Sequence, residues 1–363
     1  MSILLLFLVL FPLVIVHEFG HFIVAKKFGI RVDEFAFGFP PKLFGIKRGE
    51  TTYAFNALPI GGYVKIYGEN PDDVADDADK LRAFAAKPRI VQALVIIAGV
   101  VCNLLFAWLL IASTLMIGVA SPVDSTRAAY ITNAQLTITE VRDGSPAKAA
   151  GMRAGDALIS LGEGAELVQN LSAESVIAYI APRAGLPTAF TYERSGTVAT
   201  ATIVPASGIV EDRAAIGISM DVVGTLRLPP HKALWEGAKK TYEFTIMTTV
   251  GLWTFLSQAV TGNGDFSQVT GPVGMVSAVG AAAGVGYTNL ILFAAVISIS
   301  LAVMNVIPFP ALDGGRLLFI IIESIIRRPI PVKIANATNL VGFALLMLLM
   351  VVVTWNDVAN LLH

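Results

Sequence analysis

The sequence predicts an α-helical polytopic membrane protein of about four transmembrane helices, with a membrane-associated β-hairpin and an inserted α+β domain. Three observations lead to this fold class. Of the 363 residues, 55% are hydrophobic and only 15% are charged, and the mean hydropathy is +0.69. Four separate stretches are apolar over the ~20 residues that a bilayer-spanning helix needs. Between the second and the third, about 100 residues are polar and β-branched, which is an ordinary domain size.

The first predicted span, residues 1–25, carries the sequence His17-Glu18-Phe19-Gly20-His21. In a helix each residue turns by ~100°, so the two histidines lie ~40° apart and Glu18 shares their face. Two such histidines can bind zinc while the glutamate serves as general base. Counting ~1.5 Å per residue from Ile3, His17 lies ~21 Å along the helix, inside the ~30 Å hydrocarbon core. Ionisable groups at this depth indicate function.

Residues 26–89 are predicted to form a cytoplasmic segment with a membrane-associated β-hairpin. Lys and Arg crowd both of its ends, which the positive-inside rule places in the cytoplasm. Residues 51–58 and 63–67 alternate in strand fashion around a turn signal at 59–62. Phenylalanines before them suggest contact with the membrane, although an ordinary small β-element is an alternative: Phe35, Phe37, Phe39 and Phe44. An acidic run that follows is interpreted as a solvated linker: Asp72, Asp73, Asp76, Asp77 and Asp79.

The second predicted span, residues 90–118, places Gly99 and Asn103 four residues apart on one helical face. Glycine permits close helix approach, and an asparagine can hydrogen-bond to a neighbouring helix. Either simple helix packing or a position beside the metal site explains this pair. The single cysteine of the chain excludes an intrachain disulfide.

A soluble α+β domain is predicted at residues 120–208, opposite the cytoplasm because two spans precede it. Strand patterns occur at residues 136–141, 189–192 and 197–204. The phrase at 141–159, VRDGSPAKAAGMRAGDALI, resembles a bacterial PDZ domain. The resemblance implies a domain that binds an extended peptide by strand addition, although a domain that only spaces or filters remains an alternative.

Residues 209–287 are predicted to be an extracytoplasmic linker with amphipathic helices. The stretch 231–258 carries Lys239 and Lys240 in its first half and turns apolar from Phe244. Glu243 and several threonines make a transmembrane span less favourable. We therefore expect a helix at the membrane interface rather than a span. A Gly-Pro-Val-Gly phrase at 271–274 indicates a sharp break.

The third predicted span, residues 288–325, is interrupted by the sequence NVIPFPALDGG at 305–315. Proline breaks helical hydrogen bonding, and broken helices are tolerated in membranes where they line a cavity or are buried in protein. Asp313 can then be a third zinc ligand that leaves the fourth position open to water; pairing with Arg316 is the alternative. A fourth span at 335–355 completes a topology that places His17 and Asp313 in the cytoplasmic half of the membrane.

Taken together, HEFGH, GVVCN, NVIPFPALDGG and the PDZ-like phrase resemble the site-2 protease family of intramembrane metalloproteases, in particular its bacterial regulator of sigma-E protease group. The resemblance implies Zn²⁺ on His17, His21 and Asp313, with Glu18 as catalytic base. It also implies a multi-pass protein of the bacterial inner membrane. Relatives can carry two PDZ modules, whereas one such phrase is found here.

Substrate contacts are also implied by the resemblance. Asn305 is expected to help hold the substrate, and the hairpin, with Tyr53, Phe55 and Tyr63, to pair with an unwound substrate helix. By position alone, Asn103 is a candidate to stabilise the oxyanion. The expected substrates are single-span membrane proteins such as anti-sigma factors and remnant signal peptides.

The predicted function is therefore intramembrane zinc endopeptidase activity, through metal-activated water. One alternative is a different membrane zinc protease whose third ligand is a glutamate, for which Glu323 is available. The other is a PDZ-bearing scaffold or transporter with a vestigial metal site. The expected partners are the lipid bilayer, membrane-protein substrates and a peptide at the PDZ-like domain. No nucleic acid is expected, since the sequence shows no basic, aromatic-interleaved surface.

Overall fold

The computed structural model describes residues 1–69, 77–124, 127–162, 167–194, 196–210, 213–261 and 270–362. The chain divides into two compact units. Unit 1 consists of Met1–Ser113 and His231–His363, and unit 2 of Thr114–Pro230.

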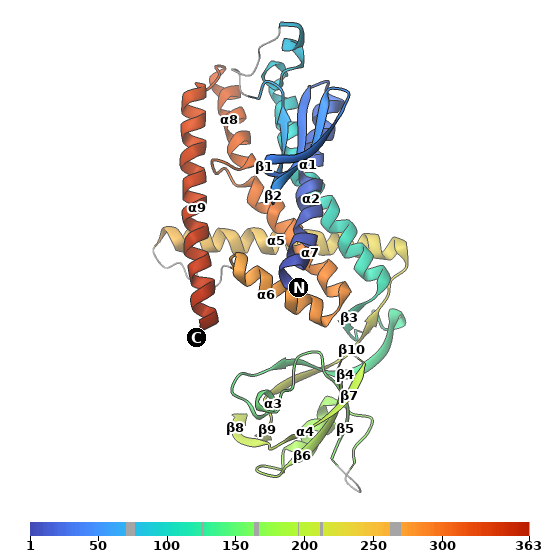
Figure 1. Ribbon diagram of the computed structural model, residues 1–363. Coiled ribbons are helices and arrows are strands. Elements are labelled where there is room, and N and C mark those ends of the chain that lie inside the picture. Colours follow the sequence, from blue (N-terminus) through green and yellow to red (C-terminus); the bar gives the residue numbers. More distant parts are fainter. Residues whose placement is uncertain are drawn as a thin grey trace. The chain divides into compact units, whose positions relative to one another are not determined.

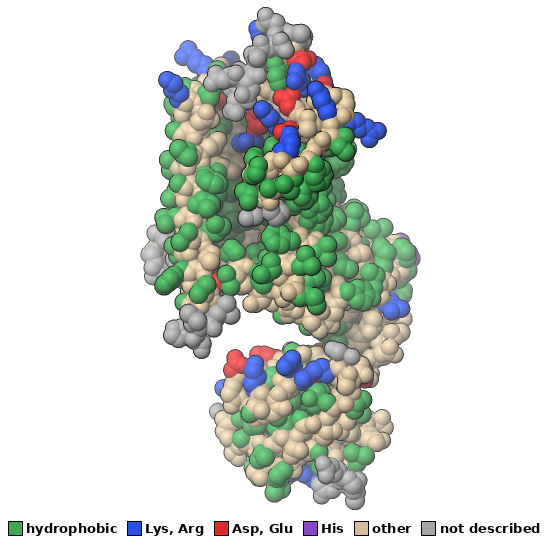
Figure 2. Space-filling view, in the orientation of Figure 1, with side chains coloured by type: hydrophobic (Ala, Val, Ile, Leu, Met, Phe, Trp, Pro, Cys, Tyr) green, Lys and Arg blue, Asp and Glu red, His purple; other side chains and the backbone are tan. Residues whose placement is uncertain are grey.

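Within the described ranges, four helices of unit 1 are long and apolar enough to cross a membrane (Figure 1). They are α1 (Ser2–Lys27), α2 (Arg89–Ile117), α7 (Tyr287–Val306) and α9 (Val332–Leu362). This confirms the prediction of a polytopic membrane protein. Figure 2 shows charged side chains at the end of unit 1 where α8 passes into α9, and hydrophobic side chains over the helices beyond it.

The predicted break in the third span is present. Helix α7 ends at Val306, and α8 (Asp313–Ile326) begins after six non-helical residues that include Pro308 and Pro310. Both prolines lack the amide hydrogen that a continuous helix would need. The carbonyls of residues 306 and 307 approach so closely to Gly314 that a Cβ there would lie 2.1–2.4 Å from them. The chain can therefore double back and place Asp313 at the first position of α8.

The helices of unit 1 pack through small residues and apolar side chains. A Cβ on Gly20 of α1 would lie 2.4 Å from the carbonyl oxygen of Ala98 on α2, so glycine allows these two helices to touch. Val9 and Leu13 of α1 share a buried cluster with Val279 of α6 (Pro272–Val285). Helix α6 is thus an apolar helix packed against α1, which differs from the linker with amphipathic helices predicted for residues 209–287.

The predicted hairpin of residues 51–58 and 63–67 is wrong in its pairing. The hairpin instead joins β1 (Val32–Arg48) and β2 (Thr51–Ile66), with its turn at Gly49 and Glu50. Both strands bend, so that their segments alternate in the order 62–66, 34–37, 52–55 and 42–48. Residues 59–62 form a bend between two segments that never pair with each other. The sequence interpretation missed this because it did not recognise residues 34–37 as the strand between them.

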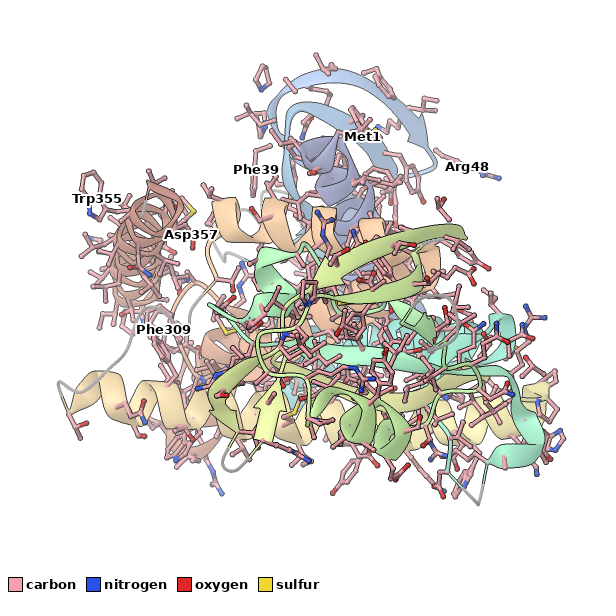
Figure 3. The ribbon with its side chains drawn as sticks, turned by 90° about the horizontal axis from the view of Figure 1, so that it is seen from below. Met1, Phe39, Arg48, Phe309, Trp355 and Asp357 are labelled. Atoms are coloured by element: carbon pink, nitrogen blue, oxygen red, sulfur yellow. The ribbon has the colours of Figure 1, made fainter. Side chains whose placement is uncertain are left out.

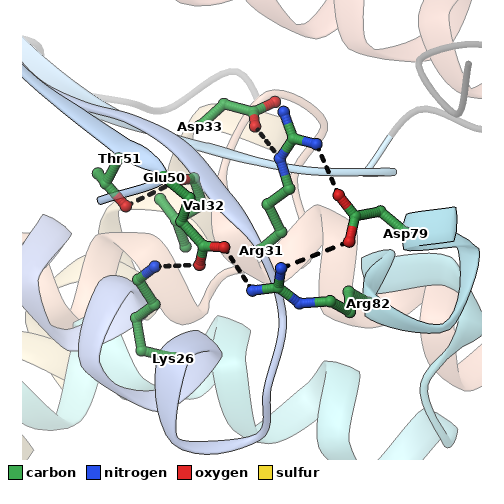
Figure 4. Close-up of polar contacts among 8 residues, drawn as sticks. All are labelled: Lys26, Arg31, Val32, Asp33, Glu50, Thr51, Asp79 and Arg82. Carbon is green, nitrogen blue, oxygen red and sulfur yellow. Dashed lines mark hydrogen bonds and ion pairs between the residues drawn. The ribbon is translucent and has the colours of Figure 1, made fainter. Parts of the chain in front are cut away.

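A charge network joins the end of α1 to this hairpin and to the short helix η2 (Asp77–Arg82) (Figure 4). Glu50 at the hairpin turn accepts hydrogen bonds from Lys26 and from Arg82, the latter at 2.5 Å. Asp79 accepts from Arg31 at 2.8 Å and from Arg82 at 3.4 Å. Asp79 is therefore part of an ion-pair network, which corrects the prediction of a solvated linker at this residue. Asp77 is the first residue of η2, and the other three aspartates of that prediction, at 72, 73 and 76, lie outside the described residues.

Helix α5 (Pro230–Val260) is not among the four candidate spans of the described chain. In Figure 1 it runs crosswise to α9 within unit 1. Its first turns dock on α2, where the Trp108 indole donates to the carbonyl of Leu234 at 2.8 Å and Gly237 contacts Ala112. Position at the membrane interface stays a prediction for this helix.

One buried carboxylate ties α9 to α6. Asp357 accepts hydrogen bonds from the backbone amides of Gly271 and Gly274, at 3.2 and 2.8 Å, in the first turn of α6. Figure 3 shows Asp357 on the side of α9 that faces this helix, and Trp355 pointing away from it. A carboxylate at a helix N-terminus both caps free amides and complements the helix dipole.

Unit 2 is built on a six-stranded sheet with the order β3-β10-β4-β5-β6-β7. Its strands are β3 (Val119–Pro122), β4 (Ile131–Val141), β5 (Ala157–Leu161), β6 (Thr188–Arg194), β7 (Thr197–Ile203) and β10 (Ile218–Leu226). Two further strands pair with each other, β8 (Ala206–Val210) and β9 (Arg213–Ala215). The strand patterns predicted at 136–141, 189–192 and 197–204 are confirmed.

Two short helices complete unit 2, α3 (Pro146–Ala149) and α4 (Ala173–Ile180), the latter held by a capping box between Ser172 and Ser175. Asp156, in the phrase that resembles a PDZ domain, is buried and accepts two 2.7 Å bonds from Arg194. Strand β10 lies between β3 and β4 in the sheet, so the domain extends past the predicted end at 208.

Candidate active site

A cavity of about 500 Å³ lies in unit 1 beside the His-Glu-x-x-His sequence. Side chains of α1, α2, α7, α8 and α9 line it, together with the C-terminal part of β2. Residues far apart in the sequence therefore meet here.

His17, His21 and Asp313 form a triangle at this cavity. The Nε2 atoms of the two histidines are 3.2 Å apart, and Oδ2 of Asp313 lies 3.0 Å from that of His17 and 3.2 Å from that of His21. Zinc holds ligands at ~2.0–2.1 Å, and two corners of such a tetrahedron are about 3.3–3.4 Å apart. Among the described residues, the His, Cys, Asp or Glu side chains that lie close enough together, in groups of three or more, to hold a metal ion are these three. The nitrogen and carboxylate donors present suit zinc.

Local backbone features place the three side chains. The histidines lie one helical turn apart on α1, as their spacing predicted. Gly99 of α2 faces both imidazoles: a Cβ there would lie 2.5 Å from Nε2 of His21 and 2.8 Å from Cε1 of His17. Only a residue without a side chain leaves room for both rings. The alternative of simple helix packing does not account for this contact of Gly99.

The remaining nitrogens of the imidazoles have partners on α2. Nδ1 of His21 lies 2.8 Å from the carbonyl oxygen of Val95. Nδ1 of His17 lies 3.3 Å from Nδ2 of Asn103, which is fully buried. Sequence reasoning missed Val95, because a backbone carbonyl leaves no mark in the residue pattern.

Glu18 and Asn305 line the same cavity. The backbone of β2 passes beside Glu18, since a Cβ on Gly62 would lie 3.4 Å from its Cγ. Asn305 donates to the carbonyl oxygen of Leu301 one turn earlier in α7. The sequence indicates Gly62 only as a turn residue, because its place at the site depends on a three-dimensional arrangement that the sequence does not reveal.

The three aromatic residues predicted to contact substrate separate into two groups. Tyr63 lines the cavity and lies in the segment 62–66, the outer segment of β2, which forms an edge of the β1–β2 sheet. Tyr53 and Phe55 lie in the segment 52–55, the inner segment of β2, which has a paired segment of β1 on each side. There Tyr53 contacts Phe22, and Phe55 stacks on Phe44 at 5.2 Å between ring centroids. The structure therefore brings only Tyr63 of these three to the cavity.

Two charged residues, Arg316 and Glu323, have other partners than the alternative roles would require. Arg316 pairs with Glu69 at the rim of the cavity, and not with Asp313. Glu323 pairs with Arg89 at 2.7 Å and accepts from the backbone amide of Ile330. It is thus engaged away from the two histidines, whereas Asp313 lies beside them.

Comparison with known proteins agrees with this geometry. Residues 5–349 match peptidase family M50. An inferred zinc metalloprotease of Clostridium perfringens is 37% identical over 350 residues, covering 95% of both chains, and one of Clostridium acetobutylicum is 34% identical over 350 residues, covering 95% of this chain and 94% of the relative. The zinc metalloprotease RasP of Geobacillus kaustophilus is 29% identical over 430 residues, covering 97% of this chain and 96% of the relative. The chain therefore belongs to peptidase family M50, the site-2 proteases, and is a membrane-embedded zinc metalloprotease.

Proposed function

We propose that this protein cleaves single-span membrane proteins within the bilayer, with His17, His21 and Asp313 as zinc ligands and Glu18 as catalytic base. The observation that carries the proposal is the triangle of ligand atoms beside Glu18, in a cavity among apolar helices. Anti-sigma factors and remnant signal peptides are the proposed substrates.

The residues divide the chemistry between them. Zinc bound at the triangle would polarise the scissile carbonyl and acidify a water molecule. Glu18 accepts the proton of that water and passes it to the leaving amine. Asn305, at the cavity wall, is in a position to hold the substrate backbone.

Substrate presentation falls to the outer segment of β2. Carbonyls of a transmembrane helix are already hydrogen-bonded, so a substrate must unwind before cleavage. Residues 62–66 pair with β1 on one side only, and Gly62, Tyr63 and Val64 line the cavity on the other. An extended substrate can add to this edge as a further strand, with its backbone beside Glu18.

The decisive experiment uses purified protein and a single-span substrate. Wild type is expected to contain about one zinc per chain and to cleave, and Glu18→Gln to keep zinc and lose cleavage. Glu323→Gln is the matched control, because this carboxylate lies away from the triangle and should leave cleavage intact. A zinc-free protein, or full activity of Glu18→Gln, would support a scaffold or transporter with a vestigial metal site.

Two tyrosines of β2 test the role of the strand edge. Tyr63→Ala should raise KM about tenfold with a smaller change in kcat, because it removes binding made in the ground state and transition state alike. Tyr53→Ala is the control on the inner segment and should leave KM unchanged. Equal effects of the two variants would argue against substrate pairing at residues 62–66.

We also propose that unit 2 is a PDZ domain that binds an extended peptide. A groove of about 300 Å³ lies between α4 and the segment from β9 into β10, and its lining is mainly apolar. Ile177→Asp, in this groove, should abolish peptide binding by the full-length protein, whereas Ile159→Asp, similarly exposed on β5 outside it, should not. Binding that survives Ile177→Asp would favour a domain that only spaces or filters.

For the topology we propose the inner membrane of a bacterium, with residues 26–89 inside and unit 2 outside. The Lys and Arg residues at the ends of residues 26–89 support this orientation. In a Cys102→Ala background, a membrane-impermeant thiol reagent applied to intact spheroplasts should label Asn170→Cys but not Lys47→Cys. The opposite labelling would invert the topology.

A further inference from the structure

Asn103 occupies an unusual position next to the triangle. Its side chain is fully buried, and its Oδ1 atom has no hydrogen-bond partner among the described residues. A buried amide oxygen without a partner costs ~1–3 kcal/mol, so its environment calls for a donor. The other end of the same amide, Nδ2, lies 3.3 Å from Nδ1 of the His17 imidazole.

The role of His17 determines what that donor is. Nε2 of His17 points at Asp313 and His21, which makes it the metal-binding nitrogen. A neutral imidazole that binds metal through Nε2 carries its proton on Nδ1. His21 shows this arrangement, since its Nδ1 lies 2.8 Å from the carbonyl oxygen of Val95, which can only accept.

An Nδ1–H group cannot donate to an amide NH₂. The oxygen and nitrogen of an asparagine side chain have nearly the same shape, and a rotation of 180° about the last bond exchanges them. With Oδ1 turned toward His17, the imidazole proton gains an acceptor and the buried oxygen gains a donor. One rotation thus satisfies both groups.

We infer that Asn103 is a positioning residue whose Oδ1 accepts the Nδ1 proton of His17 and orients that imidazole toward zinc. The inference rests on the proposed role of His17 as a ligand. It differs from the expectation that Asn103 stabilises the oxyanion, because it assigns the Oδ1 atom to the ligand histidine, whereas an oxyanion would need the NH₂ group of the same side chain, which lines the cavity.

Zinc affinity of the full-length, detergent-purified protein tests this inference without relying on activity. Asn103→Leu keeps the approximate volume but removes the acceptor, and should weaken zinc binding ~10–100-fold in competition with a chelator, as loss of such an outer hydrogen bond does. Asn103→Asp keeps an acceptor and should stay within ~3-fold of wild type, well short of that loss. Ser298→Ala is the control, because this hydroxyl donates to the backbone oxygen of Asn103 and not to its side-chain amide.

A second readout reports on the proton itself. The chain has four histidines, so selective ¹⁵N labelling gives few imidazole signals. With zinc bound, the signal that disappears in His17→Ala should show a protonated Nδ1 in wild type and in Asn103→Asp. In Asn103→Leu this hydrogen-bonded form should be lost. If Asn103→Leu does not fold, as judged by thermal unfolding of the zinc-free protein, Asn103→Ala takes its place.

The outcomes separate the possible roles. Unchanged zinc affinity in Asn103→Leu, or an equal loss in Asn103→Asp, would overturn the positioning role. If Asn103 acted only as an oxyanion donor, both variants would retain zinc and both would lose kcat. If His17→Ala retains wild-type zinc affinity, the proposed ligand set fails and the inference about Asn103 fails with it.

Discussion

Replacing Gly99 by alanine should disable the site although none of the proposed zinc ligands is substituted. The new Cβ would stand 2.5 Å from Nε2 of His21, whereas ordinary non-bonded contacts begin near ~3.5 Å. The imidazole, the helix or both must therefore shift by roughly 1 Å. A misplacement of this size in a catalytic site can cost ~10²-fold in rate, equivalent to ~2.7 kcal/mol in the activation barrier. Zinc affinity should fall as well, because the same nitrogen is a proposed ligand atom.

The assay compares cleavage rate and zinc content of Gly99→Ala with those of Gly251→Ala. Gly251 is also helical, in α5, and a Cβ there meets nothing within 4 Å. Its replacement should leave cleavage unchanged and favour helix by up to ~1 kcal/mol. If Gly99→Ala cleaves within ~3-fold of wild type, far from that ~10²-fold cost, with zinc retained, the tight fit of the imidazoles against α2 is not what positions them.

Three further changes probe the supports around the site. Asp357→Ala leaves the amides of Gly271 and Gly274 without their charged acceptor and should lower the free energy of unfolding by ~1.5–3 kcal/mol in detergent; an unchanged unfolding midpoint would show that this contact does not tie α6 to α9. Reversal of Arg316 to Glu should impair stability and be partly restored by Glu69→Arg, with a coupling of ~0.5–3 kcal/mol in a double-mutant cycle; simple additivity would contradict their pairing. Burial raises the pKa of Glu50, but hydrogen bonds from Lys26 and Arg82 and their charges lower it by more, so the pKa lies below its ordinary value. Its contribution to stability is therefore present at neutral pH and lost only as pH falls below ~4.3, through the folded-state pKa; Glu50→Gln should remove this part of the acid dependence in thermal unfolding.

Much of the membrane-embedded unit could be predicted because its signals are local or chemically costly. Apolar length predicted the spans, and the cost of an aspartate inside one required a partner for Asp313. Two prolines explain the break before it. The structure supplies the pairing of Asp313 with both histidines, which no spacing in the sequence could reveal.

Other features depend on long-range pairing, and sequence reasoning placed them incorrectly or not at all. Residues 62–66 look like one arm of a short hairpin, yet their partner is the segment 34–37. The strand pattern around 51–67 is real, but strand order is decided by where the chain bends. Likewise β10 reads as a linker until the sheet shows it between β3 and β4.

The position of Asp313 has a consequence for biosynthesis. It lies 296 residues after His17, near the end of the chain. At ~5–20 residues per second, a ribosome needs about 15–60 s to travel from one to the other. Throughout that interval the first span is already made, while Asp313, the proposed third ligand, does not yet exist. With this ligand set, the protease would stay inert beside other newly inserted helices until α8 has reached the membrane.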